Sequence, residues 1–480
     1  MKHMQKMEKN QYVVAAEPRG VKFKWLIYHL RATLLAMLPF AFLISTYFKL
    51  EKLAVVTVMI MAVVLVLSLP MATGSSKILG YILIGASVGI FIFNGSSLED
   101  WKSGVQGNID LICLFLTIPF LSVPLKHGNY LVSVESLFKQ KVKKNYQVYG
   151  FSLIMAFLLG SVFNLASLHI IHQLFCNHGN KERKELVLLA AVRGFTACIF
   201  WSPTFFSVGL VLTMTEVRWV EMFPYGFTLS LAVLLLGFIM DVVDKKQKKV
   251  PEVMDQGEDL PHEVHIAQIN YSKLWELGFL GIAVLALAII LNTFLHLSIL
   301  VLVPTVAIIM PLFWLLFLGK LPIIPGIAKE YYQQELPNHS NEIVLFTGIG
   351  MLASAIKSSS LDYYLVIGLE KIISSDPFFS MALISFFIAA LFVVGISPII
   401  TIFIVTSSLP LLSVQWEPLF LSLGLITGWA IGIVLSPFAA LNLMVGLFIQ
   451  KTPIQVSLKK NYLYALLMLP VIWGLMALFF

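Results

Sequence analysis

The chain has 480 residues, of which 58% are hydrophobic and 12% are charged, and its mean hydropathy is +0.88. Soluble globular proteins carry about 25% charged residues, so this composition excludes a soluble enzyme, a disordered chain and a nucleic-acid-binding domain. The formal net charge of +7 does not indicate a nucleic-acid partner, because the basic residues lie in short segments between apolar runs. A membrane-spanning helix needs about 20 apolar residues, and the sequence supplies many such runs. It therefore predicts an all-α polytopic membrane protein.

The N-terminal region 1–52 is predicted to hold a cytoplasmic N-terminus and the first span. Its first 24 residues are polar. The apolar run 30–48 is longer than the core of a signal peptide and has no small-residue cleavage site, which favours a retained span. Further apolar runs follow near 53–70, 78–95, 109–125, 151–175, 186–214, 222–243, 274–292, 299–318, 342–356, 377–410, 417–449 and 462–480.

The distribution of basic residues predicts the topology. If 151–175 and 377–410 each enter and leave the membrane on the same side as re-entrant hairpins, 25 of the 33 Lys and Arg residues share one face. Cytoplasmic loops carry the excess of Lys and Arg. This arrangement predicts about eleven spans and two hairpins in the plasma membrane, with the N-terminus cytoplasmic and the C-terminus outside. Non-helical backbone at membrane depth survives only beside protein or a watery cavity, so two hairpins predict a cavity.

The two halves of the chain resemble each other. The polar segment 244–273 is a predicted cytoplasmic linker between a first repeat, 53–243, and a second repeat, 274–480. Gly-Phe, six residues and Ser-Pro end at Ser202-Pro203, and Gly-Trp, six residues and Ser-Pro end at Ser436-Pro437, 234 positions later. The predicted topology sends these two spans in opposite directions, so the repeat is inverted. Inverted repeats with interrupted helices are typical of secondary transporters.

The interrupted helices and hairpin tips supply the candidate binding residues. Proline within a span removes an N–H and frees a backbone carbonyl, and the ends of half-helices carry partial charges that suit ions. Kinking or capping of packed helices is the alternative explanation for such residues. The candidates for contact with the solute or its coupling ion are Asn164, Ser202, Pro203, Ser397, Pro398, Thr401, Ser436, Pro437 and Asn442.

Arg193 is a further candidate, because a cation within a span is costly and indicates a functional site. Its guanidinium would bind the carboxylate of a solute, or else lipid headgroups or hairpin carbonyls. His169 and His172 share one helix face and are candidates for proton carriers, although packed or interfacial histidines have the same spacing. The middle of each predicted span lacks Asp and Glu, which argues against a carboxylate proton relay and against a strongly cationic solute.

This layout resembles the ion transporter superfamily and, within it, the divalent anion/sodium symporter architecture. The resemblance rests on the hairpins around Asn164 and Ser397-Pro398 and on the interrupted spans 186–214 and 417–449. The Ser-Asn-Thr motif that these symporters carry at their hairpin tips is absent. The resemblance implies a homodimer in which hairpin domains move against a fixed scaffold.

We therefore expect a secondary active transporter of a small anionic solute, an organic acid or an inorganic anion, coupled to Na⁺ or H⁺ by elevator-like alternating access. The expected partners are this solute, the coupling cation, membrane lipid and a second copy of the chain. We expect no cofactor and no resident metal. The alternatives are a cation/proton antiporter, an exporter of amphipathic compounds and, from another class, a membrane-embedded transferase.

Overall fold

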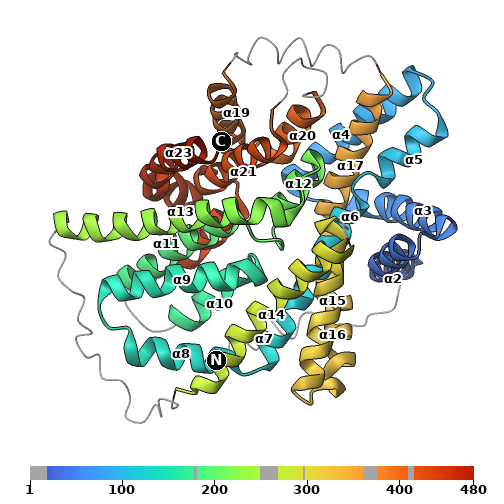
Figure 1. Cartoon of the computed structure of the whole chain (residues 1–480). Coiled ribbons are helices and arrows are strands. Elements are labelled where there is room, and N and C mark those ends of the chain that lie inside the picture. Colours follow the sequence, from blue (N-terminus) through green and yellow to red (C-terminus); the bar gives the residue numbers. More distant parts are fainter. Residues whose placement is uncertain (1–18, 177–180, 249–268, 296–297, 360–375, 409–415) are drawn as a thin grey trace.

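A computed structural model describes residues 19–176, 181–248, 269–295, 298–359, 376–408 and 416–480 (Figure 1). These residues form helices joined by short turns, and strands do not occur among them. Nine helical stretches in the described ranges are long and apolar enough to cross a membrane. The chain is thus an all-α polytopic membrane protein, as its composition predicts.

The first half begins with three long helices and continues with shorter ones before a hairpin. The helices are α2 (Arg19–Tyr47), α3 (Glu51–Ser68), α4 (Gly74–Phe93), α5 (Leu98–Gln106), α6 (Ile109–Thr117), α7 (Val123–His127), α8 (Tyr130–Lys141), α9 (Asn145–Phe163), α10 (Ala166–Phe175), α11 (Lys181–Cys198), α12 (Phe206–Thr215) and α13 (Trp219–Lys248).

The second half has a similar series. Its elements are α14 (Tyr271–Leu295), α15 (Ile299–Phe317), α16 (Ile324–Glu330), η4 (Tyr331–Glu335), η5 (Leu336–His339), α17 (Ser340–Lys357), α19 (Pro377–Val393), α20 (Pro398–Ser408), α21 (Pro418–Leu435), α22 (Ala440–Ile449) and α23 (Lys460–Phe479). The order α9, α10, α11, α12 is thus repeated as α19, α20, α21, α22.

The predicted linker 244–273 is shorter than expected at both ends. Helix α13 continues to Lys248, and α14 starts at Tyr271. The rest of that linker, 249–268, lies outside the described residues, as do the first 18 residues and positions 409–410 of the second predicted hairpin.

Local sequence sets several helix boundaries near the hairpins. Asp376 caps α19 by accepting a hydrogen bond from the Phe378 N–H, and Pro377 occupies the first helical position, where its missing N–H costs nothing. Proline also opens α20 and α21. In Figure 1, α2 to α5 and α17 lie on one side of the molecule and the hairpin α9–α10 on the other. Helices α12 and α21 lie between these groups.

Close packing of the interrupted spans on the hairpins depends on glycine. A Cβ added at Gly194 of α11 would lie 2.2 Å from the Leu153 carbonyl oxygen of α9. A Cβ added at Gly428 of α21 would lie 2.7 Å from the Ser385 carbonyl oxygen of α19. Small residues allow helix backbones in membranes to approach this closely. Each interrupted span is therefore fitted to the first arm of its own hairpin.

Candidate functional site

Each helix–turn–helix hairpin turns at a residue with positive φ. Helices α9 and α10 meet at Asn164, whose φ is 50°, and α19 and α20 meet at Gly395, whose φ is 95°. Glycine adopts this conformation without a Cβ clash, and asparagine tolerates positive φ better than most residues. Gly395 follows Asn164 by 231 positions. The two turns therefore occupy matching places in the two halves.

The two spans with Ser-Pro pairs are interrupted at those pairs. Helix α11 ends at Cys198 and α12 begins at Phe206, so Ser202 and Pro203 lie in the gap. Helix α21 ends at Leu435 and α22 begins at Ala440, with Ser436 and Pro437 between them. Proline cannot donate to the helix ladder and clashes with the preceding turn, which favours an interruption at both places, although Pro304 and Pro311 lie inside the continuous helix α15.

Matching hydrogen bonds join each interruption to the first arm of its hairpin. The Ser202 hydroxyl donates to the Ser161 carbonyl oxygen at 2.6 Å, and the Ser436 hydroxyl donates to the Phe392 carbonyl oxygen at 2.7 Å. Each serine oxygen also accepts from the N–H two residues later, at Thr204 (3.4 Å) and Phe438 (3.2 Å). The serines therefore bind the last turns of α9 and α19.

The hairpin tips also contact the interruptions. The Asn164 side-chain amide donates to the Thr204 carbonyl oxygen at 3.3 Å. At the second tip, a Cβ added to Gly395 would meet the Phe438 ring at 3.3 Å. Thr204 and Phe438 are separated by the same 234 positions as the serines. Each hairpin tip therefore contacts the interruption in the span of its own half.

Four helix N-termini open onto one cavity of about 810 Å³. Ala166, Phe206, Pro398 and Ala440, the first residues of α10, α12, α20 and α22, all line it. The first four N–H groups of an α-helix have no partner within the helix, and each N-terminus carries about +0.5 elementary charge. Carbonyls near the C-termini of α9 and α19 are hydrogen-bonded by the serines above. The partial positive charges of the four helix N-termini therefore favour a negatively charged ligand in the cavity.

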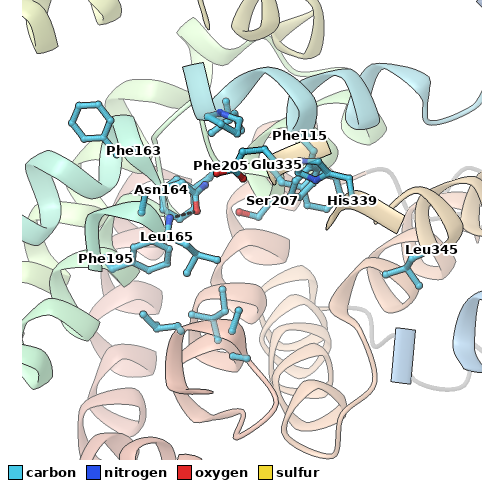
Figure 2. Close-up of a pocket in the computed structure, with 18 of the residues that line it drawn as sticks. Phe115, Phe163, Asn164, Leu165, Phe195, Phe205, Ser207, Glu335, His339 and Leu345 are labelled. Carbon is cyan, nitrogen blue, oxygen red and sulfur yellow. Dashed lines mark hydrogen bonds between the residues drawn. The ribbon is translucent and has the colours of Figure 1, made fainter. Parts of the chain in front are cut away.

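Most of the cavity wall is apolar and much of it is aromatic. Asn164 and Leu165 project into the pocket from the first hairpin tip, and His339 and Glu335 enter from a different part of the chain (Figure 2). Aromatic residues of the wall are Phe115, Phe120, Phe163, Phe195, Phe205, Phe206, Tyr331, Phe392, Trp429 and Phe438. The titratable residues of the wall are Lys126, His127, Glu330, Tyr331, Glu335 and His339.

The structure brings some predicted site residues to the wall and places others behind it. Asn164, Ser397 and Pro398 line the cavity. Ser202, Pro203, Ser436 and Pro437 do not; they lie in the interruptions, where the serines bond hairpin carbonyls. Thr401 is buried in α20 behind the tip, and its hydroxyl has no hydrogen-bond partner.

Asn442, a candidate for contact with the solute or its coupling ion, bonds the interrupted backbone of its own span. Its side-chain amide donates to the carbonyl oxygens of Ile433 (2.9 Å), Val434 (3.1 Å) and Ser436 (2.9 Å). The backbone groups released by Pro437 are thus satisfied by a side chain of the same span. Among the described residues, His, Cys, Asp and Glu side chains do not form a group of three that would hold a metal ion.

Arg193, predicted to contact a solute, lipid headgroups or hairpin carbonyls, is not among the residues that line the cavity. Its guanidinium donates to the Tyr149 hydroxyl at 2.9 Å and to the Asn461 side-chain oxygen at 3.3 Å. It also lies 4.9 Å from the Tyr464 ring centre. Only 5% of the residue is exposed. The cation therefore joins α11 to α9 and α23 instead of facing a ligand.

The two candidate proton carriers on the first hairpin also lie away from the cavity wall. His172 stacks on Phe448 of α22 with ring centres 4.1 Å apart, and His169 meets the same ring edge-on at 5.1 Å. This is the packed arrangement that was the alternative for this pair.

A charged group outside the predicted spans joins both interrupted spans to α23. Glu185, near the start of α11, pairs with Lys451 at 2.5 Å and with Lys460 at 2.8 Å. Burial alone would raise the pKa of Glu185, but its bonds to the two lysines outweigh burial, so this pKa is lowered.

Several wall residues escape the sequence analysis. Three of them, Phe206, Ser207 and Ala440, come shortly after the Ser-Pro pairs, where the next helix begins. The start of a helix after each Ser-Pro pair could have identified these residues from the sequence. His339 and Glu335 come from a predicted cytoplasmic loop. Only the folded chain brings that loop to the hairpin tips.

A comparison with known proteins identifies the fold. The sequence matches neither a protein-family model nor a curated protein. The fold is similar to the crystal structure of the Alcanivorax borkumensis YdaH transporter, with a TM-score of 0.50 and 14% sequence identity over 84% of this chain and 89% of that chain. At this identity the likeness concerns the fold, and it agrees with the predicted fold class. The narrower resemblance to divalent anion/sodium symporters stays a prediction.

Proposed function

We propose that the protein is a secondary active transporter that moves a small organic anion in exchange for, or together with, a coupling cation, Na⁺ or H⁺. The observation that carries this proposal is the convergence of four helix N-termini on one cavity. Helix N-termini bind anions through unpaired N–H groups and the helix dipole. The similarity in fold to a transporter supports the same conclusion.

The wall favours an organic anion over an inorganic one. An apolar lining with a few polar groups is typical of sites for organic ligands. The polar groups nearest the helix N-termini are Asn164, Ser207 and Ser397. We propose that an anionic group binds among them while the apolar part of the solute contacts rings such as Phe206 and Trp429.

Helix lengths support re-entrant hairpins. Helices α10 and α20 have 10 and 11 residues, which is about 15 Å at 1.5 Å per residue. The hydrocarbon core of a bilayer is about 30 Å thick, so neither second arm spans it alone. We propose that both hairpins return to the side from which they enter.

Alternating access then requires the hairpins to move with the spans that hold them. The bonds from Ser202 to Ser161 and from Ser436 to Phe392 join each hairpin to its interrupted span. We propose that these elements move as units, in a homodimer of the plasma membrane with the N-terminus cytoplasmic and the C-terminus outside.

The proposal is tested by anion binding to the purified protein in detergent. The probes are phosphate, sulfate, hexanoate, benzoate and benzenesulfonate, each with and without Na⁺, and the measurement is the melting temperature. A ligand that binds the folded state raises the melting temperature by mass action. We expect organic anions to stabilise the protein more than phosphate or sulfate.

Two variants locate the binding site. Asn164→Ala should weaken the response to organic anions, because its side chain lies on the wall. Ser152→Ala is the control, because it removes a buried hydroxyl of α9 that has no hydrogen-bond partner. No stabilisation by any anion, or an equal response in both variants, would refute the proposal.

A further inference from the structure

The segment between α16 and α17 brings a histidine to the cavity wall beside a buried cation. His339 ends η5 and lines the cavity, and its side chain is 15% exposed. Arg31, on α2, is 2% exposed. Its guanidinium donates to the Ser340 hydroxyl at 2.6 Å and to the Pro337 carbonyl oxygen at 2.7 Å. The cation thus binds the backbone before His339 and the side chain of the residue after it.

A carboxylate lies on the other side of the ring. The His339 Nδ1 atom is 4.0 Å from the Glu342 Oε2 atom. Both the His339 Nε2 atom and the Glu342 Oε2 atom are buried without a hydrogen-bond partner. The ring therefore has a free nitrogen, and an acceptor lies within reach of a small movement.

The surroundings keep the ring neutral when the cavity is empty. Burial, followed by the positive charge of Arg31, lowers the pKa of His339 to about 4. Besides Glu342 of α17, the charged or titratable groups that line the same cavity are Glu335 and Tyr331 from η4, Glu330 from α16, and Lys126 and His127 from α7.

We propose that His339 is the proton-binding group of the transporter, and that it takes up one proton when an organic anion enters the cavity. This inference rests on the proposed function. The proton adds to a neutral ring nitrogen, so the complex gains the anion and one proton together. The negative charge of the bound anion stabilises the protonated, positively charged ring. The nearby Glu342 carboxylate stabilises the same form of the ring.

The linkage between the two ligands is reciprocal. If the anion raises the affinity of His339 for a proton, a proton must raise the affinity for the anion by the same factor. Over the pH range between the two pKa values of His339, anion affinity should change by about tenfold per pH unit. This linkage makes H⁺, rather than Na⁺, the coupling ion.

The test uses the full-length protein and benzenesulfonate, whose sulfonate stays ionised at all the pH values used and cannot carry a proton itself. Its dissociation constant is measured by calorimetry between about pH 5 and pH 8. In the wild type we expect tighter binding as the pH falls and proton uptake on binding. In His339→Asn both should be lost. His29→Asn, on α2 and outside the cavity wall, should behave as the wild type.

A second variant keeps the inference testable if His339→Asn does not fold. Glu342→Gln removes the neighbouring negative charge, so the midpoint of the pH dependence should move to lower pH; a purely structural role for Glu342 predicts no such shift. If both variants bind benzenesulfonate with the same pH dependence as the wild type, the inference about His339 is wrong while the proposed function stands. Absence of binding at every pH would overturn the proposed function and this inference with it.

Discussion

The Ser161 carbonyl oxygen gives the sharpest test of how the first hairpin is held. It accepts from the Ser202 hydroxyl at 2.6 Å and from the Thr204 hydroxyl at 2.8 Å. Ser202 and Thr204 are 0% and 1% exposed, so water does not readily replace either donor. Ser202→Ala and Thr204→Val each remove one donor while the other remains.

The cost of the double variant should exceed the sum of the single costs. Each substitution also removes the contact between the two hydroxyls, 3.1 Å apart, and Ser202→Ala removes the acceptor of the Thr204 N–H. Each single variant should therefore lower the free energy of unfolding by about 0.5–1.5 kcal/mol per hydrogen bond lost. In the double variant the carbonyl of Ser161 loses both hydroxyl donors inside the protein. An unsatisfied buried polar group costs about 1–3 kcal/mol. We therefore expect a coupling energy of about 1 kcal/mol or more.

The assay is unfolding of the purified protein by SDS from a mild detergent, followed by tryptophan fluorescence. Ser436→Ala serves as a matched control in the other half. There the Phe392 carbonyl oxygen loses the Ser436 hydroxyl but keeps the Gly395 N–H at 3.0 Å. The Phe438 N–H also loses its acceptor, so the cost should be that of two hydrogen bonds, about 1–3 kcal/mol. Additive costs for Ser202→Ala and Thr204→Val, within about 0.5 kcal/mol, would refute the reasoning.

Two further predictions concern charged groups away from the cavity. Arg193→Lys should lower the free energy of unfolding by about 1–3 kcal/mol, because lysine cannot reproduce the bonds to both Tyr149 and Asn461. The dissociation constant for benzenesulfonate should stay unchanged. A large loss of affinity would show that Arg193 belongs to the binding site. Glu185→Gln should lower the melting temperature more at about pH 7 than at about pH 3, because a lowered carboxyl pKa stabilises the fold fully above the unfolded pKa of about 4.3 and this stabilisation is lost as the pH falls through the folded pKa. An equal difference at both pH values would contradict the ion pair.

The interruptions and their serines could be predicted from local sequence. Proline removes a helix hydrogen bond, but Pro304 and Pro470 lie inside the continuous helices α15 and α23. The Gly-aromatic and Ser-Pro pattern repeated 234 positions apart therefore marked Pro203 and Pro437 as breaks, not proline alone. The equal spacing of Ser202 and Ser436 from the preceding glycines identified the two halves. The hydrogen bonds from these serines to hairpin carbonyls could not be predicted from the sequence. The acceptors are the backbone oxygens of Ser161 and Phe392, and every residue has a backbone oxygen.

Long-range partners explain the predictions that the structure changed. Arg193 contacts Asn461, 268 positions away, and no local pattern indicates that a buried arginine has such a partner. Asn442 was a candidate for contact with the solute or its coupling ion, and its side-chain amide donates to carbonyls of its own span. His339 lies in a polar loop whose approach to the cavity depends on Arg31, 309 positions from Ser340.

The inverted arrangement of the two hairpins is the central claim, and accessibility of single cysteines tests it most directly. Four exposed charged residues flank the hairpins: Lys144 and Lys181 around the first, Asp376 and Glu417 around the second. We predict that cysteines at 144 and 181 react with an impermeant maleimide only from the cytoplasmic side, and cysteines at 376 and 417 only from outside. Members of one pair reacting from opposite sides, or all four reacting from the same side, would contradict the account.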